Sequence, residues 1–272
     1  MKRYSIFHPL VLSFFSKSLY RDVGKNWRGT GLLYLFVALA VVWIPTIIKG
    51  QLGLARWVDA DSKEITKQIP AITISKGQVS TDVPTPHFIK DPKTGTAIAI
   101  IDTTGEYQTL ENTEARFLLT KSKLIMGRNQ METRTYELSG VESLYIDRSL
   151  VENWLVTARR WFVPVLYPLA LIFSFIFRAI QVLIYALVGL LFARLLNANL
   201  DFKTLMRLAA ISITPVLVLN LLFEFVPGRI PWWTLIGIVI ALAYLFFAVK
   251  VNTEPDEAQA YQPPVPHPPA MP

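Results

Sequence analysis

Hydrophobic positions along the chain gather into four long blocks, separated by segments in which polar and apolar residues mix. The blocks fall at 31–48, 161–193, 208–226 and 230–249, and the charged residues within them are Arg178 and Glu224. A helix needs about 20 mainly apolar residues to cross a hydrocarbon core roughly 30 Å thick, and each block is of that order or longer. The pattern therefore predicts an α-helical membrane protein with four transmembrane helices.

The segment between the first two blocks has a different pattern. Short β-rich runs alternate with turn signals there, namely "AITIS", "TAIAIID", "RFLLT" and "TRTYEL". A segment of this length is enough for an independent domain. We therefore expect a small β-rich (α+β) domain at 50–160, inserted between spans 1 and 2 and ending in a helix that leads into the second block.

The second block is open to two interpretations. As one helix it would be about 50 Å long, more than one perpendicular span needs. As two spans it would place the basic loop 194–207 on the outer side of the membrane, against the usual bias of Lys and Arg toward the cytoplasm. We therefore predict one long, tilted helix whose first turns lie in the outer interface.

The distribution of charge predicts the orientation. The formal net charge is +7; residues 1–28 hold six basic residues against one acidic residue, whereas 49–160 hold 15 basic and 14 acidic residues. Short basic flanks beside apolar spans mark the cytoplasmic side, whereas a nucleic-acid binder gathers Lys and Arg on a folded surface. We expect a multi-pass membrane protein with both termini in the cytoplasm and no nucleic-acid partner.

This argument gives a map of nine segments. They are a cytoplasmic amphipathic N-terminus (1–28), span 1 (29–49), the extracytoplasmic β-rich domain (50–160), span 2 with an interfacial start (161–194), a cytoplasmic loop (195–205), span 3 (206–226), an outer turn (227–231), span 4 (232–249) and a disordered, Pro-rich cytoplasmic tail (250–272). Residues 4–20 have an apolar helical face between basic residues, which is typical of a helix lying in the membrane surface. No cleavage site follows them, so we expect an uncleaved N-terminus.

Composition agrees with the membrane class and narrows the chemistry. Hydrophobic residues make up 52% and charged residues 17% of the chain, and the mean hydropathy is +0.38. The chain has no cysteine, which excludes disulfides and thiol chemistry. Its three histidines, His8, His87 and His267, have no metal-ligand spacing. We therefore expect no metal and no cofactor.

Arg178 and Gln181 lie within the second block, where a charge costs about 2.5–3.5 kcal/mol on insertion scales. In a one-helix span, Arg178 would lie about two turns below the outer surface, and Glu224 would lie near the outer end of the third span, one turn beyond Asn220. We predict an intramembrane polar cluster of these four residues. It would either fix helix packing or form a site for a ligand or partner helix; alternatively, Arg178 reaches the surface alone.

Thr214 and Pro215 lie in the middle of the third span, in "ISITPVLVL". Proline removes a backbone hydrogen bond and bends a helix, and the freed carbonyl needs another partner. The pair predicts a helix kink, with a moving hinge as the alternative.

The stretch "IIDTTGE" at 100–106 is similar to an Asp-Thr-Gly protease element, but an additional threonine separates Asp102 from Gly105. A strand that ends in an Asx-type turn explains the pattern better. The chain has no G-x-S-x-G, H-E-x-x-H or phosphate-loop motif. We therefore expect no catalytic residues and no enzymatic activity.

Three stretches resemble a bacterial membrane family catalogued as domain of unknown function 1189. They are "SKSLYRDVGKNWRGTGLLYLF", "IAIIDTTG" and "LDFKTLMRLAAISITPVLVL". The last is also similar to the Yip-type membrane superfamily, in which a basic loop precedes an apolar helix containing Thr-Pro. Some members of the first family are labelled as maltodextrin-utilisation membrane proteins. The resemblance implies several spans and no established catalytic residues, and the Pro-rich tail departs from it.

The sequence, together with this resemblance, thus favours a non-enzymatic scaffold or accessory protein of the bacterial inner membrane. Its outer domain would bind a protein partner or an envelope ligand, and membrane lipid would surround its spans. The first alternative is a transporter or permease component that uses Arg178 and Glu224. The second is an envelope enzyme built around Asp102.

Overall fold

The computed structural model describes residues 3–129, 132–226, 228 and 230–253. The chain divides into two compact units: Met1–Ile48 with Val165–Pro272, and Lys49–Pro164. We call the first the helical unit and the second the sheet unit. Most of the predicted Pro-rich tail and part of the predicted 227–231 turn lie outside the described residues.

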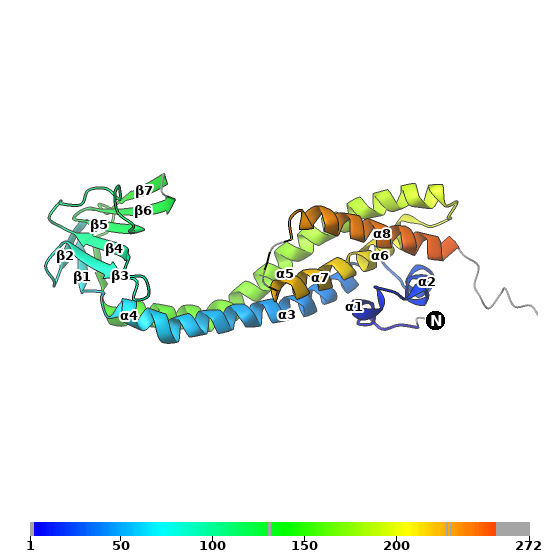
Figure 1. The fold of residues 1–272 in the computed structure, drawn as a ribbon, viewed down its shortest axis with the longest axis horizontal. Helices are drawn as coiled ribbons and strands as arrows, with labels where there is room; N and C mark the ends of the chain where they lie inside the picture. Colours follow the sequence, from blue (N-terminus) through cyan, green and yellow to red (C-terminus); the bar gives the residue numbers. More distant parts are fainter. Residues whose placement is uncertain (1–2, 130–131, 227, 229, 254–272) are drawn as a thin grey trace, which may run out of the picture. The chain divides into compact units, whose positions relative to one another are not determined.

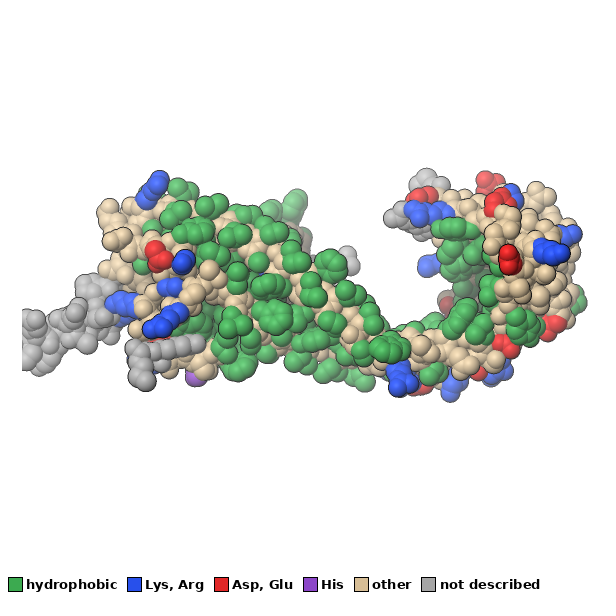
Figure 2. Space-filling model, turned by 180° about the vertical axis from the view of Figure 1, so that it is seen from behind, with side chains coloured by type: hydrophobic (Ala, Val, Ile, Leu, Met, Phe, Trp, Pro, Cys, Tyr) green, Lys and Arg blue, Asp and Glu red, His purple; other side chains and the backbone are tan. Residues whose placement is uncertain are grey.

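Four helical segments are long and apolar enough to cross a membrane, as predicted from the four hydrophobic blocks. They are α3 (Leu32–Arg56, continuing to Thr66 through later turns), α5 (Arg148–Leu195), the pair α6 (Phe202–Ser212) and α7 (Thr214–Glu224), and α8 (Trp233–Thr253). Figure 2 shows hydrophobic side chains over the visible face of the helical unit, with basic side chains at one end of it. The second block forms one uninterrupted helix rather than two.

The α6–α7 pair lies at the centre of the helical unit. In the most apolar 18-residue stretch of this pair, 72% of the residues are buried inside the protein, whereas in the corresponding stretch of α5 22% are buried. Gly189 of α5 faces α6 and α8, since a Cβ at this position would lie 3.4 Å from Leu205 and 3.7 Å from Leu245. The α6–α7 pair is therefore covered by protein, whereas much of α5 presents apolar side chains outward.

The N-terminal segment differs from the predicted surface helix at 4–20. It forms two short helices, α1 (Pro9–Leu12) and α2 (Lys17–Asn26), separated by a turn at which Ser16 caps α2. Leu19, Tyr20 and Val23 are fully buried, and α2 packs against α6 and α8 (Figure 1). The predicted apolar face lay earlier in the segment, where Phe7 and Val11 are exposed, and periodicity did not identify the buried positions of α2.

The sheet unit contains two small sheets. The three-stranded sheet has the antiparallel order β2-β1-β8, and the five-stranded sheet has the order β3-β4-β5-β6-β7 with one parallel pair, β4–β5. The strands are β1 (Ile72–Ser75), β2 (Gln78–Thr81), β3 (His87–Lys90), β4 (Ala97–Asp102), β5 (Phe117–Thr120), β6 (Lys123–Asn129), β7 (Glu132–Glu137) and β8 (Ser143–Ile146). The four β-rich runs seen in the sequence correspond to β1, β4, β5 and β7.

The five-stranded sheet has an apolar core on each face. Ile101 of β4 belongs to the core shared with the three-stranded sheet, and its neighbour Ile100 belongs to the core under the 103–116 loop. Alternate side chains of a strand point to opposite faces, so a strand buried on both faces is apolar throughout. This is why "AIAIID" is a continuous apolar run that ends at a single carboxylate.

Helical segments complete the sheet unit. The end of α3 continues through a π-helical turn, η1 (Trp57–Asp61), into α4 (Ser62–Thr66), and this segment lies beside the start of α5. Arg159 of α5 donates to both carboxylate oxygens of Asp59, at 2.8 and 2.9 Å, and Gln51 donates to the backbone oxygen of Arg159. The two chain segments that flank the sheets are thus held to each other.

Candidate functional site

Arg207 of α6 connects several segments of the helical unit. Its guanidinium donates to the backbone oxygens of Val23 (3.3 Å), Gly24 (3.2 Å) and Gly29 (2.8 Å), and to Thr204 Oγ1 (2.6 Å). Only 9% of the residue is exposed. Arginine presents five N–H donors in a fixed plane, so one side chain can bind several carbonyls at once. We call this arrangement the Arg207 junction.

Two glycines allow the N-terminal segment to reach Arg207. Gly29 and Gly31 both have positive φ angles, +78° and +80°, which residues with a Cβ rarely adopt. A Cβ at Gly31 would lie 2.9 Å from the Cα of Arg207, whereas a Cβ at Gly29 would meet nothing within 4 Å. Gly31 therefore permits close packing of backbones as well as the turn.

Asp22 organises the same segment from its other side. Its carboxylate accepts hydrogen bonds from the backbone N–H groups of Arg3 and Tyr4 and from the side chains of Asn26 and Trp27. Burial acts to raise the pKa of Asp22, but these hydrogen bonds outweigh it and the pKa lies below its usual value. The carboxylate is therefore held charged, and it ties residues 3–4 to the end of α2.

The end of α8 closes the junction. Asn252 donates to the backbone oxygens of Tyr20 and Ala248, at 3.1 and 2.8 Å, and its side chain occupies the space that a Cβ at Gly24 would need. The hydroxyl of Tyr20 donates to the backbone oxygen of Ser13, and burial raises the pKa of that hydroxyl. The first helices are thus fixed to the C-terminal ends of the bundle.

Asp201 sets the N-terminus of α6. Its carboxylate accepts from Thr204 Oγ1, and Thr204 Oγ1 accepts from Arg207. The hydrogen bond from Thr204 is the main reason that the pKa of Asp201 lies below its usual value. Arg207 was not predicted as a site residue, although an arginine one turn inside an apolar helix indicates a buried polar contact.

The structure separates the predicted four-residue cluster into three parts. On α5, Arg178 donates to Gln181 Oε1 at 2.5 Å, and Gln181 donates to the hydroxyl of Tyr185 at 2.8 Å. Glu224, at the end of α7, accepts from Thr46 of α3 at 2.6 Å. Among the described residues no ion pair within 4.0 Å joins Arg178 to Glu224. The predicted pairing of Arg178 with Glu224 is therefore not found, and each residue has another partner.

Asn220 and the predicted kink have separate surroundings. Asn220 accepts a hydrogen bond from Trp233 Nε1 at the start of α8. The helix is interrupted at Ile213, so that α6 ends at Ser212 and α7 begins at Thr214, immediately before Pro215. The side chain of Ser212 donates to the backbone oxygen of Leu208, and Thr214 Oγ1 forms a 2.6 Å hydrogen bond with the hydroxyl of Tyr34.

Asp102 ends strand β4 in an Asx-type turn, as the sequence indicated. One carboxylate oxygen accepts from the backbone N–H and the hydroxyl of Thr104, and the other accepts from the N–H of Tyr107. The residue is fully buried. Burial acts to raise the pKa of Asp102, but the hydrogen bonds from Thr104, Tyr107 and Gly105 outweigh it and lower the pKa. The carboxylate is an acceptor that shapes a loop.

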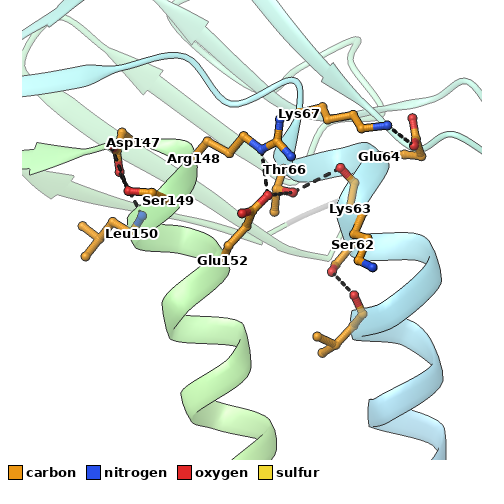
Figure 3. A network of polar contacts seen from close by, with 11 residues as sticks. Ser62, Lys63, Glu64, Thr66, Lys67, Asp147, Arg148, Ser149, Leu150 and Glu152 are labelled. Carbon is orange, nitrogen blue, oxygen red and sulfur yellow. Dashed lines mark hydrogen bonds and ion pairs between the residues drawn. The ribbon is translucent and has the colours of Figure 1, made fainter.

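A pocket of about 410 Å³ in the sheet unit is lined by apolar and polar residues: Ile69, Pro70, Ala71, Asp82, Asp147, Arg148, Ser149 and Glu152. Glu152 of α5 accepts from Arg148 and from Thr66 of α4, as Figure 3 shows. Asp147 caps α5 by accepting from Ser149 and from the N–H of Leu150. These groups join α4 to the start of α5. In the described part of the chain, no group of three or more His, Asp or Glu side chains is arranged to hold a metal ion.

Comparison with known proteins gives one result. No curated protein and no solved structure matches the chain. A family model described as "Protein of unknown function (DUF1189)" matches residues 7–249. Two of the stretches that carried the resemblance, in the N-terminal segment and in α6, meet at the Arg207 junction. Because the match spans most of the sequence, the chain belongs to the DUF1189 family of proteins of unknown function.

Proposed function

We propose that the protein is a non-enzymatic, multi-pass scaffold or accessory protein of the bacterial inner membrane, which binds a protein partner through its sheet unit. The four apolar helices support the membrane placement. Exposed basic residues gather at the end of the helical unit that holds the Arg207 junction: Lys25, Arg28, Lys203 and Lys250. By the positive-inside bias this end faces the cytoplasm, so that both termini are cytoplasmic and the sheet unit is extracytoplasmic.

The observation that carries the binding proposal is the open edge of strand β7. All six of its residues, Glu132–Glu137, are exposed, and β7 is the last strand of its sheet. An edge strand leaves a row of backbone N–H and C=O groups without strand partners, and an extended segment of another protein can pair with such a row. A strand supplied by a partner is therefore the occupant that we propose.

Side chains beside this edge suit a protein interface. The register pairs Phe117 with Met126 and Met126 with Arg134, and it pairs Leu124 with Tyr136, so these side chains share one face of the sheet. Phe117 is 39% and Tyr136 47% exposed. Aromatic residues, Met and Arg are enriched at protein interfaces, and buried Tyr and Arg often dominate their binding energy.

The test places a photo-crosslinking phenylalanine analogue at position 136 or position 145 of the full chain in native membranes. Tyr145 of β8 is the matched control, because it is a tyrosine of the same unit with 55% exposure. We expect a discrete protein adduct from position 136 but not from position 145, and a loss of about tenfold in that adduct when Arg134→Glu is added. Equal adducts at the two positions, or no effect of Arg134→Glu, would reject the β7 surface.

The alternatives have less support. The transporter hypothesis needed Arg178 and Glu224 to act together, and these residues have different partners. The enzyme hypothesis needed a reactive Asp102, whose two carboxylate oxygens both accept hydrogen bonds within its own turn. The likeness of the α6–α7 region to the Yip-type superfamily belongs to the proposal, and it rests on the basic loop and the Thr-Pro helix alone.

A further inference from the structure

Arg178 lies deeper in the helical unit than its sequence position indicated. The ring of Phe175, less than one turn before it on α5, lies 5.5 Å from the ring of Phe36 on α3. Because α5 runs antiparallel to α3, moving three residues from Phe175 to Arg178 corresponds to moving about 4.5 Å toward the start of α3. This brings Arg178 to the level of Tyr34, whose hydroxyl bonds Thr214.

A second contact gives the same level. Gly189 of α5 packs against Leu205 of α6. Arg178 is 11 residues before Gly189, a rise of about 16 Å, and the same rise along the α6–α7 pair leads from Leu205 to Val216. Both estimates place Arg178 near the break between α6 and α7. That break is about 15–18 Å from either end of the α6–α7 pair, which is the middle of this span.

Arg178 has no negative partner among the described residues. Its guanidinium donates to the neutral Gln181, and it lies 5.7 Å from the ring centroid of Phe177. Gln181 is toward the C-terminal end of α5, so the side chain does not extend toward the outer surface. An arginine has five N–H donors. In the described part of the chain, the donor of Arg178 that has an acceptor is the one bonded to Gln181.

The rest of this chain offers little to neutralise that charge. The segments 32–48, 165–195 and 233–253 contain no Asp or Glu, and 202–224 contains only Glu224. Glu224 is ten residues from Thr214, or about 15 Å in height. A second copy of the chain would therefore present no carboxylate at the level of Arg178. Phosphate groups of lipids lie at the membrane surfaces, beyond the ends of the apolar spans.

We infer that Arg178 is an intramembrane binding site for a carboxylate, Asp or Glu, carried at mid-depth by a transmembrane helix of a different protein. A charge in the middle of a bilayer is costly unless paired, and arginine binds a carboxylate through two parallel hydrogen bonds. Apolar side chains of α5 near Arg178, such as Ile176, Phe177 and Ile180, are more than half exposed and would pack on the same partner. The inference rests on the proposed membrane placement.

The experiment places a photo-crosslinking phenylalanine analogue at position 177 of the full chain in native membranes, alone or with Arg178→Gln or Arg178→Lys. Arg194→Gln is the matched control, because Arg194 is a second arginine of α5 at its exposed inner end. The adduct is mapped by mass spectrometry. In parallel, native mass spectrometry compares wild type and Arg178→Gln in nanodiscs of phosphatidylglycerol and of phosphatidylcholine.

The expected result is an adduct to an apolar helix that contains an acidic residue at mid-depth. Arg178→Gln should reduce its yield by at least about tenfold, since truncation of one member of a desolvated charge pair is costly. Arg178→Lys should retain part of the yield, Arg194→Gln should change it less than twofold, and neutralising the partner's acidic residue should abolish it. Failure at position 177 with success at position 136 would overturn this inference alone.

Several results would overturn the inference. They are an adduct only to a second copy of this chain, equal yields from wild type and Arg178→Gln, and retention of phosphatidylglycerol that depends on Arg178 without a protein adduct.

A separate experiment controls for folding. If Arg178 serves a partner, Arg178→Leu should leave the thermal unfolding of the isolated protein unchanged or raise its midpoint, because it removes an uncompensated charge. A large fall in that midpoint would assign Arg178 to internal packing and reject the inference.

Discussion

Arg207 Nη1 donates a 2.8 Å hydrogen bond to the backbone oxygen of Gly29, a residue 178 positions earlier in the chain. The same guanidinium reaches two further carbonyls of the N-terminal segment. One side chain therefore supplies donors to three carbonyls that would otherwise lack them, at a place where helix α2 has ended. These bonds hold the end of α2 and the turn after it against α6.

Replacing Arg207 should release that segment. We expect Arg207→Ala to lower the free energy of unfolding by about 2–4 kcal/mol, because several buried carbonyls lose their donors together. Arg207→Lys should recover less than half of the loss, since an ammonium cannot reproduce the planar fork. The measurement is thermal unfolding in nanodiscs combined with hydrogen exchange at the amides of residues 17–31. Lys203→Ala, an exposed site on α6, is the control and should be nearly neutral.

Two glycines near the junction allow a matched comparison. Gly29→Ala should cost about 1–2 kcal/mol, which is the penalty of a side chain at positive φ. Gly31→Ala has the same penalty and also brings a Cβ to 2.9 Å from the Cα of Arg207, so it should cost at least about 1 kcal/mol more. The unfolding midpoints of the two variants test the close approach. Equal effects would mean that the backbones separate easily and that Gly31 is needed only for its φ angle.

Residue pattern predicted the parts of this fold that local physics determines. The four apolar blocks required helices, and "IIDTTGE" required a turn because an aspartate followed by threonine and glycine satisfies its own loop. Strands such as "QVST" and "SLYI" were not predicted, since four residues show too little alternation to distinguish them from loops. The parallel β4–β5 pair was also beyond reach, because no local signal encodes which strands become neighbours.

The height of Arg178 along the helical bundle was predicted wrongly from the sequence. Counting from the assumed outer end of a tilted helix over 161–194 put Arg178 near Glu224, whereas α5 extends over 48 residues. The contacts of Phe175 and Gly189 move it toward the level of Thr214 instead. A long helix can slide along its neighbours with no change in hydrophobicity, so only the packing partners fix its height. The same limitation hid the role of Arg207, whose carbonyl partners are more than 170 positions away.

Asp102 should make the sheet unit sensitive to acid. The pKa of its carboxyl is lowered in the folded protein, so its contribution to stability is complete above the unfolded value of about 4 and is lost as the pH falls through the lower folded value. Asp102→Asn should cost about 1–3 kcal/mol at pH 7, because it removes charge-assisted hydrogen bonds from a buried site. The difference between wild type and variant should shrink as the pH falls below about 4.

Hydrogen exchange at the amides of Thr104 and Tyr107 reports this effect locally, since both N–H groups are donated to Asp102. Amides of β1 serve as the control, because they belong to the other sheet. If the gap in protection between wild type and Asp102→Asn were constant from pH 7 to pH 3, the carboxylate charge would have no part in holding the turn.

The hydrogen bond between Tyr34 and Thr214 should tie α3 to the break between α6 and α7. Both side chains are buried, and their oxygens are 2.6 Å apart. Each of Tyr34→Phe and Thr214→Val should cost about 1 kcal/mol, because the hydroxyl left behind loses its partner in an apolar interior. The double variant should cost little more than one single variant, since no group is then left without its partner. A double-mutant cycle by thermal unfolding in nanodiscs measures this coupling, expected at about 0.5–1.5 kcal/mol. Strictly additive losses would mean that the two hydroxyls act separately and that Thr214 stabilises the break through Ala210 alone, whose backbone oxygen lies 3.5 Å from its hydroxyl.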